Sequence, residues 1–107
     1  MPDPILVKQR IDEIEAEMKR IGYWSDTPLP PEAYNFRQAF AMDTMAFSQW
    51  LQFVFVPRVN QLVQSGGAFP ARSQVGAQAV RDFDGADEAS RLVSLLSEFD
   101  RYVEGRG

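Results

Sequence analysis

The stretch Trp50–Arg58, WLQFVFVPR, is the most informative part of the chain for its architecture, together with the stretch Met42–Met45, MDTM, that shortly precedes it. This part of the chain has the densest apolar surface in the sequence and ends in an arginine. Its aromatic and β-branched residues favour a strand, whereas the glutamines spread over positions 49–64 suit a long helix. No other segment offers a partner strand, and a lone strand leaves its backbone polar groups unpaired. We therefore predict a helix from Thr44 to Gln64.

The ends and the interior of this helix carry further signals. Asp43 or Thr44 is expected to cap its start, and Gly66-Gly67 to end it. Pro57 predicts a bend, because it lacks an amide hydrogen and its ring crowds the preceding turn. Apolar residues cover the helix nearly all round, so it is either central or partly exposed for a partner. Because three other segments each offer an apolar stripe, we favour the central position.

Two more long helices are predicted. The first, Pro4–Ile21, begins with Asp3 as cap and has apolar residues at spacings of 4, 3, 4 and 3, namely Val7, Ile11, Ile14, Met18 and Ile21. The last, Ala86–Glu104, has an equivalent stripe at spacings of 3, 4, 3 and 4, namely Ala89, Leu92, Leu96, Phe99 and Val103.

The remaining segments are shorter or irregular. Val75–Phe83 is predicted to be a short helix with Val75, Ala79, Val80 and Phe83 facing inward. Residues 23–41 form an irregular connection held by its aromatic side chains, with Pro31–Tyr34 as a short helical turn. The PxxP spacing of its prolines also suits a docking ligand, but they lie among core-sized rings. The chain is thus expected to be one all-α domain, residues 1–107, a small helical bundle with three long helices and one or two short ones.

The composition narrows the chemistry. The chain has no histidine and no cysteine, which excludes serine–histidine and cysteine–histidine catalysis and thiolate metal sites. The carboxylates at positions 82–88 do not reproduce a calcium-loop spacing. We expect no metal, no cofactor and no catalytic residues, and the sequence favours a non-enzymatic role.

Charge and hydropathy bear on partners and location. The net charge is −4, and the eleven basic residues are spread along the chain, so we do not expect direct nucleic-acid binding. No apolar run is long enough to span a bilayer, and no secretory signal is evident. We expect a cytoplasmic protein that does not bind membranes and whose partner is a protein, either itself or another chain.

Arg58 is the main candidate for a functional residue. On a helical wheel it falls inside the apolar arc around Phe47, so the charge needs a partner or must reach out to solvent. One hypothesis pairs it with Asp12 or Glu15 of the first helix, or with a group near the last helix. The other places it in a pocket for an anionic ligand or a partner's carboxylate, bounded by Tyr34, Asp43, Trp50 and Arg58.

The stretch Phe40–Met45, FAMDTM, and the segments Trp50-Leu51-Gln52 and Val56-Pro57-Arg58 resemble the YqcC-like family of small bacterial proteins. The resemblance covers nearly the whole chain, including Tyr23-Trp24, and implies an all-helical bundle in a bacterial cytoplasm. Members of the family are often linked to tRNA pseudouridine synthesis (pseudouridylation), but the family supplies no catalytic residues to carry over. Pseudouridine synthases are larger and contain sheets, and this chain has none of their features.

Three functional hypotheses follow. The preferred one is a non-enzymatic accessory or protein-interaction domain linked to tRNA modification. The second is a small anionic-ligand-binding protein with a pocket near Asp43 and Arg58. The third is a carboxylate-based enzyme that acts through Asp43.

Overall fold

The computed structural model describes residues 3–37, 40, 44–69 and 73–105. Within them the chain is helical and contains no strand, so the all-α prediction is confirmed and the strand reading of residues 50–56 is wrong. The elements are the helices α1 (Pro4–Arg20), α2 (Phe47–Trp50), α3 (Val56–Ser65), α4 (Val75–Asp82) and α5 (Ser90–Val103), the π-helical turn η3 (Leu51–Phe55), and the 3₁₀ turns η1 (Pro31–Tyr34) and η4 (Asp87–Ala89).

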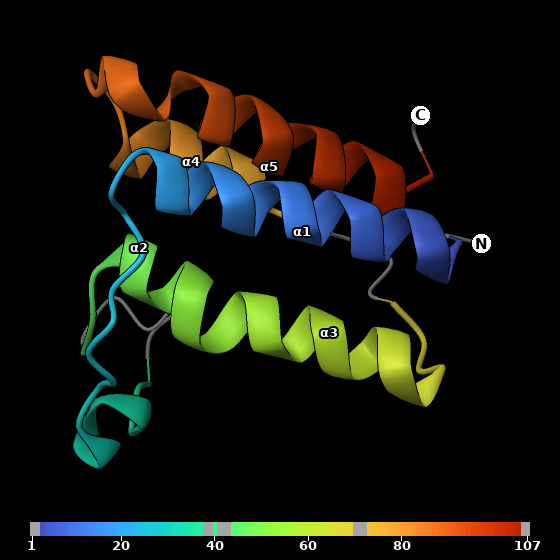
Figure 1. The fold of residues 1–107 in the computed structure, drawn as a ribbon, viewed down its shortest axis with the longest axis horizontal. Coiled ribbons are helices and arrows are strands. Elements are labelled where there is room, and N and C mark those ends of the chain that lie inside the picture. The colour runs from blue at the N-terminus through green and yellow to red at the C-terminus, as the bar shows by residue number, and fades with distance from the viewer. Residues whose placement is uncertain (1–2, 38–39, 41–43, 70–72, 106–107) are drawn as a thin grey trace.

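The helices pack side by side in a fixed order. α3 packs on α1, α1 on α5, and α5 on α4. α3 runs opposite to α1, and α4 runs opposite to α5 (Figure 1). α1 and α5 therefore form the middle of the bundle and α3 lies at one side, which corrects the expectation that the second long helix is central. Its broad apolar surface is covered on the far side by the connection that follows α1, where Phe40 packs edge-on against Trp50 with ring centroids 5.0 Å apart.

The core lies between α1, α5 and the continuous helix formed by α2, η3 and α3. Four residues of the predicted α1 stripe are fully buried, namely Val7, Ile11, Ile14 and Met18. Leu51 of η3 and Leu92 and Leu96 of α5 are also fully buried. The rings of Phe55 and Phe99 meet edge to face at 5.2 Å, which joins the second long helix to α5 across the core. Burial of these apolar side chains is the main force that holds the helices together.

The irregularity near Pro57 takes the form of a π turn. The amide of Val56 donates to the carbonyl of Leu51, five residues back, and residues 51–55 form the wider turn. Proline at position 57 has no amide hydrogen, and its ring crowds the carbonyl four residues earlier. A wider turn directly before the proline gives that ring room, and π turns of this kind are commonly found at functional sites.

The start of the second long helix differs from the prediction. The cap is Ala46, whose amide donates to the side chain of Gln49 at 2.8 Å. Thr44 is not the cap, because its hydroxyl donates to the carbonyl of Ala33 at 2.7 Å and so fastens η1 to this part of the chain. Asp43, the other predicted cap, lies outside the described residues. The C-terminal prediction is confirmed, since Gly66 ends α3 in the left-handed conformation, with φ 69°.

A buried carboxylate fastens α4 to α5. Asp100 of α5 accepts hydrogen bonds from the Ser73 hydroxyl, from the Val75 amide at 3.2 Å and from the Gly76 amide at 2.8 Å. These amides belong to the first turn of α4, so a residue of another helix caps it. Burial raises the pKa of Asp100 above its ordinary value, although the three hydrogen bonds oppose that shift.

The close approach of α4 to α5 depends on Gly76. A Cβ atom at this position would lie 2.5 Å from the Cα of Ser97. The prediction for the inward face of α4 is confirmed for Val75 and Ala79, which are buried, but wrong for Val80, which is 56% exposed. The face of α4 that packs against α5 is the one that carries Gly76, because glycine allows the close contact. Val80 lies on the other side of α4, toward solvent.

Candidate functional site

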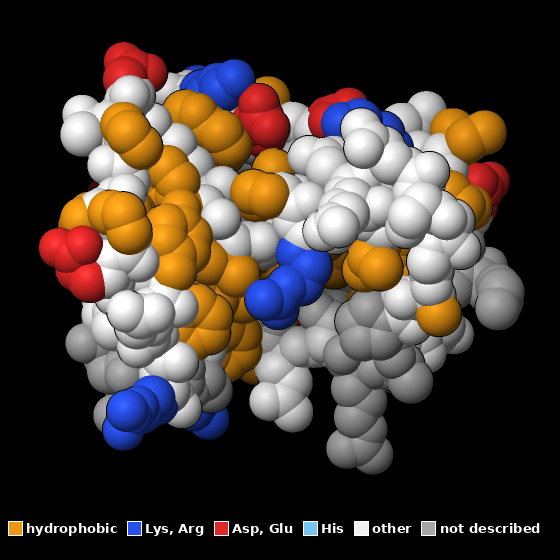
Figure 2. All heavy atoms as spheres, turned by 90° about the horizontal axis from the view of Figure 1, so that it is seen from below, with side chains coloured by type: hydrophobic (Ala, Val, Ile, Leu, Met, Phe, Trp, Pro, Cys, Tyr) orange, Lys and Arg blue, Asp and Glu red, His pale blue; other side chains and the backbone are white. Residues whose placement is uncertain are grey.

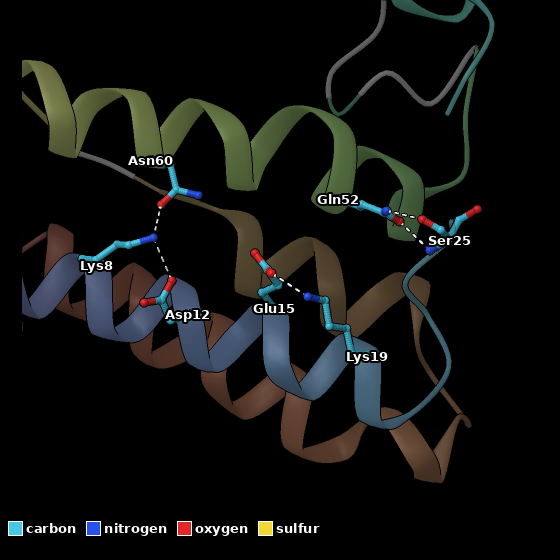
Figure 3. A network of polar contacts seen from close by, with 7 residues as sticks. All are labelled: Lys8, Asp12, Glu15, Lys19, Ser25, Gln52 and Asn60. Atoms are coloured by element: carbon cyan, nitrogen blue, oxygen red, sulfur yellow. Dashed lines mark hydrogen bonds and ion pairs between the residues drawn. The ribbon is translucent and has the colours of Figure 1, made fainter. Parts of the chain in front are cut away.

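The candidate site is built on the outer side of the second long helix, next to the connection between α1 and α2. Gln52 of η3 is buried, and its side chain holds Ser25 by two hydrogen bonds. The Ser25 amide donates to Oε1 at 2.8 Å, and Nε2 donates to the Ser25 carbonyl at 2.6 Å (Figure 3). This pair and the bond from Thr44 to Ala33 place η1 beside the helix.

A first hollow, here called the Tyr34 hollow, lies between η1 and the helix. It has a volume of about 250 Å³ and is lined by Tyr34, Phe36, Phe53, Val54, Pro57, Arg58 and Gln61. Tyr34 is 44% exposed, so its ring forms part of the open rim. The hollow thus combines aromatic walls with the polar side chains of Arg58 and Gln61.

A second hollow, here called the Trp50 hollow, lies between the helix and the start of α4. It has a volume of about 210 Å³ and is lined by Trp50, Phe55, Arg58, Val59, Leu62, Phe69, Ser73, Gln74, Val75 and Phe99. Most of these side chains are apolar, and Arg58 again supplies the charge. The mixture of an apolar wall and a few polar groups is typical of binding sites.

Arg58 lines both hollows and is exposed. In the described part of the chain it forms no ion pair, so the predicted pairing with Asp12 or Glu15 is wrong. Asp12 binds Lys8 at 2.9 Å and Glu15 binds Lys19 at 2.9 Å (Figure 3). Each acid has a lysine four residues away on its own helix, which leaves the guanidinium of Arg58 available to a ligand or partner.

The predicted site residues are only partly brought together. Tyr34 and Arg58 line one hollow and Trp50 and Arg58 line the other, so Arg58 is the residue that they share. Trp50 is 8% exposed and serves mainly as a wall. Asp43 lies outside the described residues, so the structure does not place it.

Several residues of the hollows were missed by the sequence analysis. Val54, Gln61 and Leu62 lie four residues before, three after and four after Arg58, and each lines one of the hollows with it. That helical spacing was a usable signal for them. No comparable signal pointed to Phe36 or Phe69, because the connections that carry them show no periodicity.

The surface around the two hollows has apolar side chains over about half of its extent. Figure 2 shows apolar side chains gathered there, with a basic side chain near the middle of the face and acidic side chains toward its edges. Between Thr44 and Phe69, Arg58 is the only charged residue in the sequence. The helix that crosses this face therefore contributes one positive charge, Arg58, among apolar and neutral polar residues.

Other charged groups serve the scaffold. Glu17 of α1 is buried, accepts a 2.7 Å hydrogen bond from Nε of Arg20, and lies 3.7 Å from Nε of Arg91 on α5. The hydrogen bonds from Arg20 lower the pKa of Glu17, against the opposite effect of burial, and the charges of Arg20 and Arg91 lower it further. The hydrogen bond that Tyr23 donates to Glu88 raises the pKa of Tyr23 and lowers that of Glu88.

The described residues provide neither a metal site nor a membrane-spanning helix. No group of three or more acidic, histidine or cysteine side chains there could hold a metal ion. No helix among them combines the length and the hydropathy needed to cross a bilayer.

Comparisons with known proteins identify relatives of the chain. An uncharacterised protein of Haemophilus influenzae is 31% identical over 92 residues, which make up 83% of this chain and 84% of the relative. Protein YqcC of Escherichia coli K12 is 31% identical over 64 residues, 60% of this chain and 59% of the relative. A Pectobacterium carotovorum protein named tRNA pseudouridine synthase C is 38% identical over 64 residues, 60% of this chain but 17% of that protein.

The fold also has a solved counterpart. The solution NMR structure of YqcC from E. coli matches with a TM-score of 0.86 over 100% of this chain and 92% of that one, at 22% identity. At this identity the likeness concerns the fold alone. The family model described as "DUF446: tRNA pseudouridine synthase C" matches residues 6–102. The chain therefore belongs to the DUF446 family of YqcC-like proteins.

Proposed function

We propose that the protein is a non-enzymatic accessory domain that binds a tRNA pseudouridine synthase and contributes to tRNA modification through that partner. The match to the Pectobacterium protein carries the proposal. A segment similar to this chain makes up 17% of a protein named tRNA pseudouridine synthase C, so most of that protein lies outside the match. A domain that is joined to an enzyme in one organism is a natural binding partner for the separate enzyme in another.

The chemistry of the chain supports a binding role. It lacks histidine and cysteine, the side chains most often used for proton transfer and nucleophilic attack near neutral pH. Its candidate site is an exposed arginine between two hollows with apolar walls. Arginine and aromatic residues are enriched where protein interfaces concentrate their binding energy.

The test uses the purified protein and the tRNA pseudouridine synthase C of the same host. We expect a complex with micromolar or tighter affinity in biolayer interferometry, and faster pseudouridine formation in tRNA when the protein is added. Arg58→Glu should weaken the complex about tenfold, because it reverses the one charge that the chain carries between Thr44 and Phe69.

Arg101→Glu is the matched control, since Arg101 is an exposed arginine on α5 and does not line either hollow. It should leave the affinity unchanged. The proposal fails if the protein and the synthase show no association at micromolar concentrations. It also fails if the isolated protein binds tRNA as tightly without the synthase as with it.

The second candidate function is the binding of a small anionic ligand at Arg58. The Trp50 hollow supports it, because an apolar cavity of about 210 Å³ with a guanidinium at its edge suits an amphipathic carboxylate. Binding of 3-phenylpropionate that is lost in Arg58→Glu and retained in Arg101→Glu would favour this function over the first.

A further inference from the structure

We propose that the surface formed by Arg58 and the two hollows that it lines, here called the Arg58 face, docks an extended partner segment. In this segment an acidic side chain lies between two apolar ones, with the acid on Arg58 and one apolar side chain in each hollow. This inference rests on the proposed function, and it adds the chemistry by which the partner is recognised. Its sequence signature is an apolar residue, an acidic residue two positions on, and an apolar residue two positions further.

Arg58 lies between the two hollows around the circumference of α3. At about 100° per residue along α3, Pro57 and Gln61 fall on one side of Arg58, at about 100° and 60°. Val59 and Leu62 fall on the other side, at about 100° and 40°. The first pair lines the Tyr34 hollow and the second pair lines the Trp50 hollow. An occupant of both hollows must therefore cross the helix over Arg58.

Charge complementarity selects the middle residue of the occupant. Arg58 is exposed, has no ion-pair partner in the described part of the chain, and is the only charge between Thr44 and Phe69. A carboxylate would gain charge-assisted hydrogen bonds from this guanidinium without meeting an acidic neighbour on the same helix. A basic segment would be repelled at the same place.

The span decides between a segment and a small molecule. A helix with its side chains is about 10–12 Å across, so an occupant that reaches from one hollow to the other must extend over roughly that distance. In an extended peptide, residues i and i+4 lie about 13 Å apart, and i, i+2 and i+4 point to the same side. Five residues therefore suffice to place two apolar anchors and the acid between them.

The experiment selects random peptides displayed on phage against the full protein and counts the signature among the enriched sequences. A synthetic peptide of the most enriched sequence is then titrated by fluorescence anisotropy. We expect Arg58→Glu to weaken binding about tenfold or more and Arg101→Glu to leave it unchanged. Replacement of the peptide's acid by lysine should abolish binding to the wild type and restore binding to Arg58→Glu.

Two further variants test the hollows separately. Gln61→Trp should fill the Tyr34 hollow, and Leu62→Ala should remove part of the wall of the Trp50 hollow. Each change should lower the affinity for the peptide severalfold. Because Arg58 and Gln61 are exposed, their variants should keep the wild-type circular dichroism spectrum. The docking inference is overturned if the enriched peptides lack the acid or bind Arg58→Glu as tightly as the wild type. It is also overturned if 3-phenylpropionate displaces them at equal concentration, which would make the occupant a small acid.

The outcomes separate this inference from the proposed function. If the peptides bind through Arg58 but the synthase does not bind, the docking chemistry stands and the named partner is wrong. If the synthase binds the wild type and Arg58→Glu equally well, the partner stands and the docking chemistry is wrong.

Discussion

Gly76 shows how the absence of one side chain sets the distance between two helices. Its missing Cβ lets the first turn of α4 lie directly against Ser97 of α5, and the Gly76 amide reaches Asp100 at 2.8 Å. Glycine inside a helix ordinarily costs about 1 kcal/mol relative to alanine. Here the close contact and the hydrogen bond to a buried carboxylate offset that cost.

We predict that Gly76→Ala destabilises the protein in spite of the better helix propensity of alanine. The new Cβ would meet backbone atoms of Ser97 at 2.5–2.7 Å, and backbone cannot move aside as a flexible side chain can. The expected loss in the free energy of unfolding is about 1–2 kcal/mol, measured by urea denaturation. Ala77→Ser, at the exposed neighbouring position, should change stability by less than about 0.5 kcal/mol. Equal stability of Gly76→Ala and wild type would mean that α4 does not lie this close to α5.

At the scale of the elements, polar side chains place the segments that apolar periodicity leaves unplaced. Gln52 is the clearest case, because an amide on a mostly apolar helix holds both backbone groups of Ser25. Glu17 plays an equivalent part between α1 and α5 through Arg91. Neither residue differs in the sequence from the other glutamines and glutamates of its helix.

We predict that Gln52→Ala releases the connection after α1 from the helix. The change removes the side chain that bonds the Ser25 amide and carbonyl; because Ser25 is exposed, water can take over part of this bonding, and each lost hydrogen bond costs about 0.5–1.5 kcal/mol net. Hydrogen exchange at the Ser25 amide should become at least about tenfold faster, as seen by NMR. Gln64→Ala, at an exposed position of α3, is the control and should leave this exchange rate unchanged. An unchanged rate in Gln52→Ala as well would contradict the anchoring role.

We predict that Glu17 makes stability depend on pH on the acid side. The pKa of Glu17 is lowered in the folded protein, so the folded state binds a proton there less readily than the unfolded chain. Its contribution is complete above the ordinary glutamate pKa of about 4.3 and is lost as the pH falls through the lowered value. Because Arg20 and Arg91 are largely exposed, about 1 kcal/mol is expected at neutral pH.

The measurement compares wild type with Glu17→Gln by urea denaturation at pH 7 and at about pH 3. The wild type should be the more stable at pH 7, and the difference should shrink toward zero at the lower pH. Glu13→Gln, at an exposed position of the same helix, should show no such convergence. A difference that stays constant with pH would show that the charge of Glu17 is not what stabilises the contact.

At the scale of the whole molecule, one continuous core joins all the long helices. Buried residues of α1, α3, α4 and α5 belong to the same cluster, and the partly buried rings of Trp24 and Tyr102 pack against it. The described chain is small, with a radius of gyration of 13.4 Å, which is about the value expected for a single domain of this length.

We predict that the protein unfolds in one cooperative step. The far-ultraviolet circular dichroism, which reports the helices, and the fluorescence of Trp24 and Trp50, which reports the connection and the core, should give coincident thermal transitions. Two separated transitions would show that the connection between α1 and α2 is a cooperative unit of its own.

The fold class, the long helices and most of their buried stripes could be predicted from local sequence patterns alone. Each of these depends on local spacing: Val7, Ile11, Ile14 and Met18 recur at the helical period, Asp3 caps α1, and Gly66 ends α3. Residues within one helix have relative positions that the helical repeat dictates, so their common face can be predicted without knowledge of the rest of the chain.

Which helices meet, and what Arg58 faces, became known only from the three-dimensional packing. The apolar breadth of the second long helix suggested a central position, but the connection after α1 covers its outer side, and α1 and α5 occupy the middle. Arg58 was expected to find an acid on α1, yet each candidate acid binds a lysine of its own helix. Contacts between segments far apart in the chain depend on how whole faces pack together, and no short sequence pattern contains that information.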